Sequence, residues 1–229
     1  MPDIKSYPTH IYSTNEEVLN TLSHVVGIYI STVIGTMICQ TICSSPNFTW
    51  LSFLGMLAYC FSTVFMYTMS SAYHCVQYLP VKRWLRLLDH VAIYFTIAGT
   101  STPIGVLLIE RGGGGINELV GTWVLVLQWM AVFGGTVFKV FTVGKFPLVS
   151  TIIYVILGWT CAIPIVCMYP MLSSFEAFLV VGGGAIYTIG SVFYSLQKMR
   201  YFHGIWHVFV LVGGTMHGIF MLELVKRLF

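Results

Sequence analysis

The chain has 229 residues, of which 57% are hydrophobic and 8% are charged, and its formal net charge is +3. An ordinary soluble domain has roughly 25% charged residues, so this composition excludes a soluble globular enzyme and predicts an integral membrane protein. It also argues against nucleic-acid binding, because the few basic residues lie in short loops. No polar stretch is long enough for a separate soluble module, so we expect one membrane domain over residues 1–229.

Apolar segments long enough to cross a bilayer, about 20 residues each, alternate along the chain with short polar or turn-rich breaks. A backbone in lipid must satisfy its own hydrogen bonds, so we predict an all-α bundle of seven transmembrane helices. The predicted spans are residues 19–43, 49–73, 88–109, 118–138, 147–168, 173–196 and 204–225. The breaks between them are 44–47, 77–86, 111–118, 139–147, 168–174 and 197–203.

Lysine and arginine are distributed unequally between the two sides of such a bundle. The side that carries the carboxyl terminus has three of them, Arg111, Lys226 and Arg227. The amino-terminal side has the other eight, Lys5, Lys82, Arg83, Arg86, Lys139, Lys145, Lys198 and Arg200. Because basic loops stay in the cytoplasm, we predict a cytoplasmic amino terminus, a carboxyl terminus outside, and a multi-pass location in the cell's inner (plasma) membrane.

Polar side chains near the ends of the spans gather at the predicted cytoplasmic end of the bundle. In chain order they are Glu16, Asn20 and His24 at the start of the first span, Ser70 and His74 at the end of the second, Asp89 and His90 at the start of the third, and His203 and His207 at the start of the seventh. An ionisable group within a span costs about 2.5–3.5 kcal/mol, so such groups usually face the bundle interior and serve a function. Their common depth therefore predicts one buried site.

The histidines in this set favour a metal site. His203 and His207 are four residues apart, so on a helix they share one face and can bind one ion together with a ligand from another segment. We predict that His74, His203 and His207 bind zinc and that water occupies the fourth position. Zinc lowers the pKa of such a bound water to about 7. Nickel, copper and iron also accept these residue types.

The remaining polar residues have predicted roles around the metal. Asp89 is placed to hydrogen-bond the water as general base, and Ser70 to orient water or donate to an oxyanion on the substrate. His90 points about 100° away from Asp89 on a helix, so we expect a supporting or structural role for it. We expect a hydrogen-bonding role for His24. The stripe that joins it to Glu16 and Asn20 is either an interfacial helix start or a structural clamp near the site.

These residues resemble the motifs of the progestin and adipoQ receptor family, in its bacterial haemolysin III-type branch. The shared motifs are Glu16-x3-Asn20-x3-His24, Ser70-x3-His74 with Asp89 downstream, and His203-x3-His207. The resemblance implies a seven-helix bundle with a zinc ion on its cytoplasmic side, held by the three histidines of the second and seventh spans. The family also resembles alkaline ceramidases, which implies hydrolysis of a lipid amide within the membrane. The chain departs from the receptor members in having no long amino-terminal domain, which argues against ligand-controlled signalling of their kind.

Two kinds of function fit such a site. The first is a zinc-dependent hydrolase that cleaves an amide or ester bond, with a membrane lipid as substrate. The alternative is a non-enzymatic membrane sensor or receptor-like protein, or a haemolysin acting in cytolysis, whose structural metal has a fourth protein ligand such as His24 or Asp89. Metal transport is a weaker hypothesis, because the outer half of the bundle lacks a matching polar path. No oligomeric state is predicted.

Overall fold

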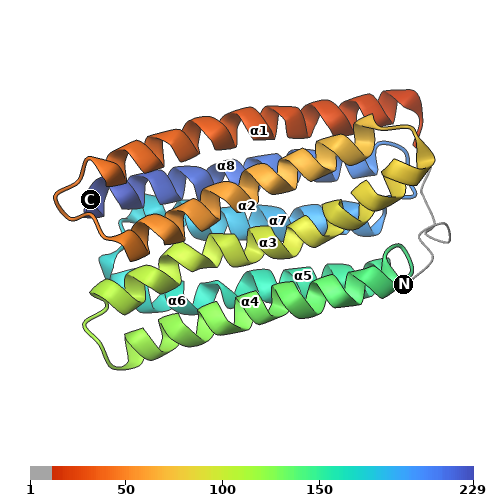
Figure 1. The fold of residues 1–229 in the computed structure, drawn as a ribbon. Helices are drawn as coiled ribbons and strands as arrows, with labels where there is room; N and C mark the ends of the chain where they lie inside the picture. Colours follow the sequence, from red (N-terminus) through yellow and green to blue (C-terminus); the bar gives the residue numbers. More distant parts are fainter. Residues whose placement is uncertain (1–11) are drawn as a thin grey trace.

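The computed structural model describes residues 12–229. Every regular element in this range is helical, and Figure 1 shows the helices packed side by side along one long axis. The elements are α1 (Thr14–Cys43), α2 (Trp50–Cys75), α3 (Leu79–Arg111), α4 (Ile116–Thr142), α5 (Pro147–Thr160), α6 (Ala162–Met168), a 3₁₀ turn η2 (Tyr169–Met171), α7 (Ser174–Ser195) and α8 (Phe202–Leu228).

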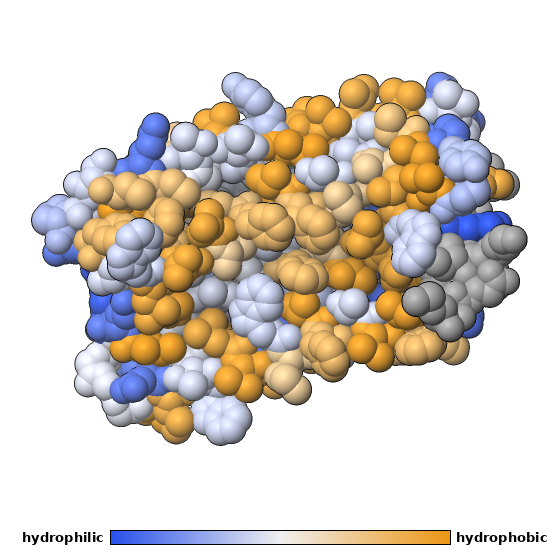
Figure 2. All heavy atoms as spheres, in the orientation of Figure 1, coloured by the Kyte–Doolittle hydropathy of each residue, from blue (hydrophilic) through white to orange (hydrophobic). Residues whose placement is uncertain are grey.

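Seven spans within the described range are long and apolar enough to cross a membrane, because α5, α6 and η2 together form one, Pro147–Met171. The prediction of an all-α bundle with seven spans is therefore confirmed. Figure 2 shows hydrophobic side chains over the middle of the bundle and hydrophilic ones gathered toward its two ends, as a surface in contact with lipid requires. The direction of the bundle across the membrane stays a prediction, and Lys5, on which it partly depends, lies outside the described residues.

Two helices begin earlier than the sequence predicts. α1 starts at Thr14 rather than near residue 19, because Ser13 and Glu16 form a capping box in which each side chain accepts the backbone N–H of the other. α3 starts at Leu79, so most of the break predicted over residues 77–86 is helical. Its first turn contains a proline, whose missing N–H is tolerated there. The predicted loop was wrong because basic residues were taken as loop residues, whereas they belong to the first turns of a helix.

The order of packing brings three helix ends together. α1 packs against α2 and α8, α3 packs against α2 and α4, and α7 packs against α8. Consequently the carboxyl end of α2 and the amino ends of α1 and α8 meet at one end of the bundle (Figure 1). This is the end at which the sequence places its histidine motifs.

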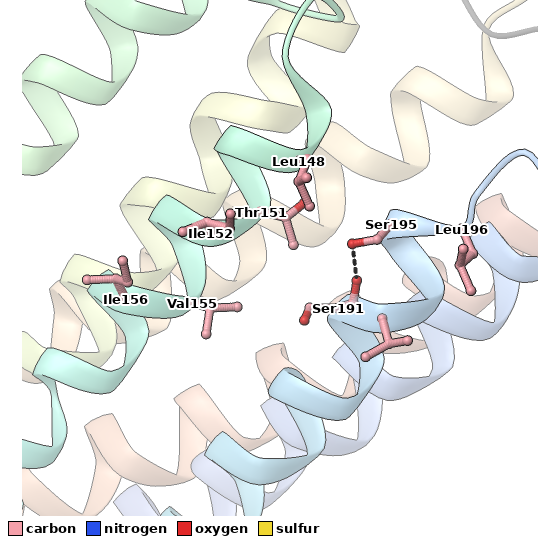
Figure 3. A pocket seen from close by; sticks show the side chains of 9 residues that line it. Leu148, Thr151, Ile152, Val155, Ile156, Ser191, Ser195 and Leu196 are labelled. Atoms are coloured by element: carbon pink, nitrogen blue, oxygen red, sulfur yellow. Dashed lines mark hydrogen bonds between the residues drawn. The ribbon is translucent and has the colours of Figure 1, made fainter.

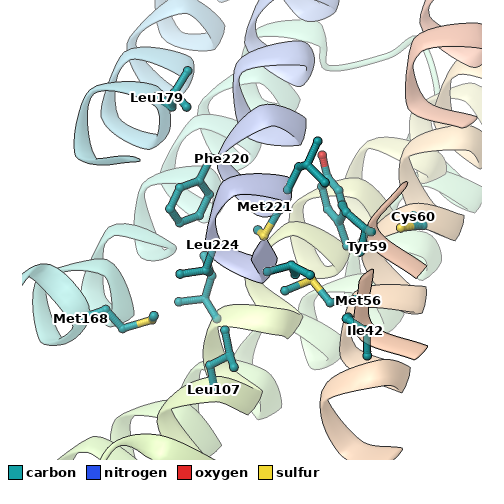
Figure 4. Packing of buried hydrophobic residues seen from close by; sticks show 14 of the residues in the cluster. Ile42, Met56, Tyr59, Cys60, Leu107, Met168, Leu179, Phe220, Met221 and Leu224 are labelled. Atoms are coloured by element: carbon teal, nitrogen blue, oxygen red, sulfur yellow. The ribbon is translucent and has the colours of Figure 1, made fainter. Parts of the chain in front are cut away.

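The main hydrophobic core occupies the opposite half of the bundle, where α1 and α8 end and α2 begins (Figure 4). Its buried side chains include Ile38 and Ile42 of α1, Met56 and Tyr59 of α2, Leu107 and Leu108 of α3, and Phe220, Met221 and Leu224 of α8. Close packing of these apolar groups stabilises the bundle there. The candidate site lies in the other half.

Candidate metal centre

Three imidazoles converge at the end of the bundle where α1, α2 and α8 meet. The Nε2 atoms of His74 and His203 are 3.2 Å apart, and those of His203 and His207 are 3.1 Å apart. His74 lies in the last turn of α2, and the other two lie in the first turns of α8, all three buried. Among the described residues they form the one group of three or more His, Cys, Asp or Glu whose ligand atoms gather closely enough to share a metal ion.

The spacing of these nitrogens fits a metal ion. Zn–N bonds of about 2.0–2.1 Å at the tetrahedral angle separate two ligand nitrogens by about 3.3 Å, close to the distances found here. The Nδ1 atom of His207 faces the backbone oxygen of Asn20 at 3.0 Å, and that of His74 faces a carboxylate oxygen of Glu17 at 2.6 Å. Both acceptors require a proton on Nδ1, so both Nε2 atoms carry lone pairs toward the same point. A cation between them removes the repulsion of facing lone pairs.

The polar surroundings of His74 extend to a third helix. Glu17, on α1, accepts from His74 Nδ1 with one carboxylate oxygen and from Lys82 Nζ, on α3, with the other, at 2.8 Å. Lys82 also donates to the backbone oxygens of Tyr73 and Val76, at 3.0 and 3.1 Å. A chain of charged groups thus joins α3 and α1 to the candidate ligand on α2.

Neither Glu17 nor Lys82 was predicted from the sequence to belong to this site. A signal for Glu17 was present: it stands three residues before Asn20 and seven before His24, so all three share one helix face. Glu16 is instead occupied by the capping box, and its Oε1 accepts the Tyr201 backbone N–H at 2.9 Å. It therefore clamps the start of α1 to the start of α8. Lys82 was counted as a loop residue, and nothing in its local sequence indicates burial.

Asn20 and His24 lie on α1 directly against the three imidazoles. Asn20 is completely buried, and besides its backbone contact its side-chain Nδ2 lies 3.4 Å from His74 Nδ1. His24 stacks on His207 with ring centroids 3.8 Å apart and an interplanar angle of 7°. Neither ring nitrogen of His24 has a hydrogen-bond partner among residues 12–229, whereas the sequence predicted a hydrogen-bonding role. His24 is therefore a packing partner of a candidate ligand.

Asp89 and Ser70 are near the site but contact none of the three imidazoles by hydrogen bonds within the described range. The Asp89 side chain, on α3, is 16% exposed, and its carboxylate lies 3.4 Å from His90 Nδ1. Ser70 is buried one turn before His74 on α2.

His90 contacts neighbouring helices through both its ring and its backbone. Its Nδ1 donates to the Arg86 backbone oxygen at 2.9 Å, and its own backbone oxygen accepts from the Tyr154 hydroxyl at 2.9 Å. The Tyr194 hydroxyl lies 3.4 Å from its Nε2. These contacts tie α3 to α5 and α7.

An aromatic side chain covers the end of the site. The Tyr12 ring, which precedes α1, stacks on His203 with centroids 5.0 Å apart, and its hydroxyl donates to Gln197 Oε1 at 3.2 Å. Burial raises the pKa of the Tyr12 hydroxyl well above its usual range, so the group stays neutral. The three imidazoles are thereby shielded from bulk water at this end.

A groove opens on the outer surface between α5 and α7 (Figure 3). It has a volume of about 380 Å³, and none of the three histidines lines it. Most of its side chains are apolar, and those that line it are Leu148, Thr151, Ile152, Val155, Ile156, Ser191, Val192, Ser195 and Leu196. Such a surface fits a hydrocarbon chain better than a polar ligand.

Comparisons with known proteins agree with this architecture. The family model described as "Haemolysin-III related" matches residues 12–218. The chain is 33% identical over 201 residues to Hemolysin-3 of Bacillus cereus, with 88% of each chain covered. It is 32% identical over 205 residues to the Hemolysin-3 homolog of Bacillus subtilis (strain 168), with 90% of this chain and 92% of the relative covered. It is also 23% identical over 211 residues to the human Monocyte to macrophage differentiation factor, with 88% and 81% covered.

Proposed function

The chain belongs to the haemolysin-III-related family, and we propose that it is a zinc-dependent hydrolase that cleaves an amide or ester bond of a membrane lipid. The proposal depends on one observation, the convergence of three buried imidazole nitrogens without a fourth His, Cys, Asp or Glu in the group among the described residues. Three histidines and an open position are typical of catalytic zinc, whereas structural zinc usually has four protein ligands. When bound, zinc would supply Lewis-acid polarisation of a carbonyl group and of water.

Two side chains handle the proton and the developing charge in this proposal. Asp89 takes a proton from the attacking water and delivers it to the leaving amine or alcohol as the carbon–nitrogen or carbon–oxygen bond breaks. Its position, on α3 beside His90 and outside the ligand group, supports that role. Ser70 donates its hydroxyl proton in a hydrogen bond to the oxyanion that forms on the substrate carbonyl.

The location of the site supports a lipid substrate. All three histidines belong to helices that cross the membrane, so a substrate with a hydrocarbon chain can reach them without leaving the bilayer. The apolar groove between α5 and α7 supports this, because its lining matches an acyl chain. We place the protein in the cell's inner (plasma) membrane.

Metal content and hydrolysis, measured together, test this function. Protein purified in detergent without chelators should contain about one zinc per chain and release fatty acid from a ceramide-type amide or an ester lipid. The variant His203→Ala/His207→Ala should lose both zinc and activity. His217→Ala is the matched control, because this histidine is also on α8 but lies outside the group of three. Its Nε2 donates to the backbone oxygen of Val180 on α7, at 3.1 Å. Zinc-loaded protein that releases no fatty acid from any lipid class would contradict the proposal.

The names of two relatives favour membrane lysis as a second candidate. A lytic protein needs no open metal position, so its activity should persist in the Asp89→Asn variant. Leakage of dye from vesicles of bacterial lipid measures this directly. Leakage that requires zinc and releases fatty acid would instead support lipid hydrolysis as its cause.

A further inference from the structure

Lys82 is a buried cation whose donors are all used. An ammonium group has three N–H donors, and those of Lys82 face Glu17 Oε1 at 2.8 Å and the backbone oxygens of Tyr73 and Val76 at 3.0 and 3.1 Å. Only 4% of the residue is exposed. The ammonium is therefore held in one place, at the carboxyl end of the helix that carries His74.

Glu17 passes this constraint on to His74. Its Oε1 is occupied by Lys82, and its Oε2 accepts from His74 Nδ1 at 2.6 Å. A carboxylate only accepts hydrogen bonds, so His74 must carry its proton on Nδ1 and its lone pair on Nε2. That lone pair faces the point shared with His203 and His207.

Stability does not account for this ion pair. Burying two charges costs several kcal/mol per ion, and well-packed apolar residues often replace such a pair without loss of stability. The other ion pairs of lysine or arginine in the described range have no such neighbour: Arg227–Glu176 and Lys226–Glu223 lie toward the opposite end of the bundle. An ionisable pair within membrane helices, in contact with a candidate metal ligand, indicates a role at that ligand.

The three candidate ligands differ in what faces their Nδ1 atoms. His207 Nδ1 donates to a neutral backbone oxygen, and His203 Nδ1 has no hydrogen-bond partner among residues 12–229. His74 alone faces a carboxylate. A carboxylate behind a histidine fixes its ring and raises its strength as a ligand, and removing such a partner typically costs 10–100-fold in metal affinity.

We propose that Glu17 and Lys82 are positioning residues for the metal: Lys82 orients Glu17, and Glu17 fixes the tautomer and direction of His74. This inference rests on the metal site of the proposed function, but it concerns affinity for the ion and makes no claim about the reaction. Its effect should therefore be visible in zinc binding alone, without substrate.

Zinc affinity of the full chain in detergent, measured by competition with a chelator, tests the role of Glu17. The Glu17→Gln variant should bind zinc about 10–100-fold more weakly and still reach one zinc per chain at saturation. Glu176→Gln is the matched control, because it removes another buried, ion-paired glutamate from the first turn of a membrane helix. Equal zinc affinity in Glu17→Gln and wild type would overturn the proposal.

A double-mutant cycle tests whether Lys82 acts through Glu17. In the wild-type background Lys82→Met should weaken zinc binding by about tenfold, because Glu17 loses its fixed orientation. In the Glu17→Gln background the same change should not weaken it, since there is no carboxylate left to orient. If Lys82 were only a positive charge near the metal, its removal would tighten zinc binding in both backgrounds, which would overturn the proposal. Lys139→Met, the loss of a buried lysine bonded to Ser150, is the control.

A measurement on the unaltered protein covers the case in which a variant does not fold. ¹⁵N NMR of histidine-labelled, zinc-loaded protein should show His74 bound through Nε2, with a proton on Nδ1. Binding of zinc through Nδ1 of His74 would overturn the inference. Wild-type protein that binds no zinc would overturn both this inference and the proposed function, whereas zinc binding with an unchanged Glu17→Gln affinity would overturn the inference alone.

Discussion

Glu16 and Glu17 are neighbours in sequence, but their side chains have different surroundings. Glu16 is bonded to the start of its own helix and to the Tyr201 backbone N–H, and it touches no candidate ligand. Tyr201 has a positive φ of 64°, which is unfavourable for a residue with a side chain. The bond from Glu16 holds this strained turn immediately before the two histidines of α8.

We therefore expect Glu16→Ala to act on stability. The change removes half of a capping box and the bond to Tyr201 N–H, so the free energy of unfolding should fall by about 1–2 kcal/mol. A thermal melt of the detergent-purified protein measures this, and zinc at saturation should remain one per chain. A variant that melts like the wild type would show that the clamp is not needed.

Asp89 differs from the histidines because its carboxylate lies outside the group that could share a metal. We expect Asp89→Asn, which keeps the shape but removes the base, to lower lipid hydrolysis by about 10²–10⁴-fold. Its zinc content should equal that of the wild type, by elemental mass spectrometry. Loss of zinc in this variant would instead identify Asp89 as a fourth ligand and favour a structural metal. The Glu223→Gln variant, which alters a half-buried carboxylate away from the site, controls for loss of a carboxylate.

At the scale of helices, α7 and α8 pack closely at the glycine run 182–184. A Cβ atom on Gly183 would lie 2.5 Å from the His217 ring and 3.2 Å from the Gly213 backbone oxygen. A Cβ atom on Gly184 would meet nothing within 4 Å. The middle glycine is thus required by packing between two helices, whereas the next is not.

This contrast predicts opposite effects from the same substitution at adjacent positions. Gly183→Ala should destabilise the protein by about 1–3 kcal/mol, because the added methyl group overpacks a closed interface. Gly184→Ala should be neutral or stabilising by up to about 1 kcal/mol, since alanine is the better helix former. Thermal melts of both variants compare them directly. Equal melting temperatures would mean that α7 and α8 can move apart at no cost.

For the molecule as a whole, the sequence was sufficient to predict what depends on local patterns. Apolar runs predicted seven spans, and the four-residue spacing of His203 and His207 predicted a shared helix face. The convergence of these two with His74 also followed, from counting how many times the chain reverses. What could not be predicted depends on contacts between side chains on different helices. The local sequence around Lys82 is typical of a loop, and only the packing of α3 against α2 brings Lys82 to Glu17.

The unequal distribution of lysine and arginine predicts which end of the bundle faces the cytoplasm, and two cysteines of the chain can test it. Cys43 ends α1 and Cys75 ends α2, so they lie at opposite ends of the bundle, and both are exposed. Variants that retain one or the other can be treated with a membrane-impermeant maleimide in right-side-out membrane vesicles. With a cytoplasmic amino terminus, Cys43 should react in sealed vesicles and Cys75 only after permeabilisation.

The reverse pattern of labelling would place the amino terminus and the three histidines at the outer face. Because Cys75 directly follows His74, its reactivity reports on the side from which the candidate site meets water. A site at the cytoplasmic face would take its zinc and its water from the cell interior and release a polar product there. A site at the outer face would take its metal from outside the cell, so the labelling also decides which metal pool the three imidazoles can reach.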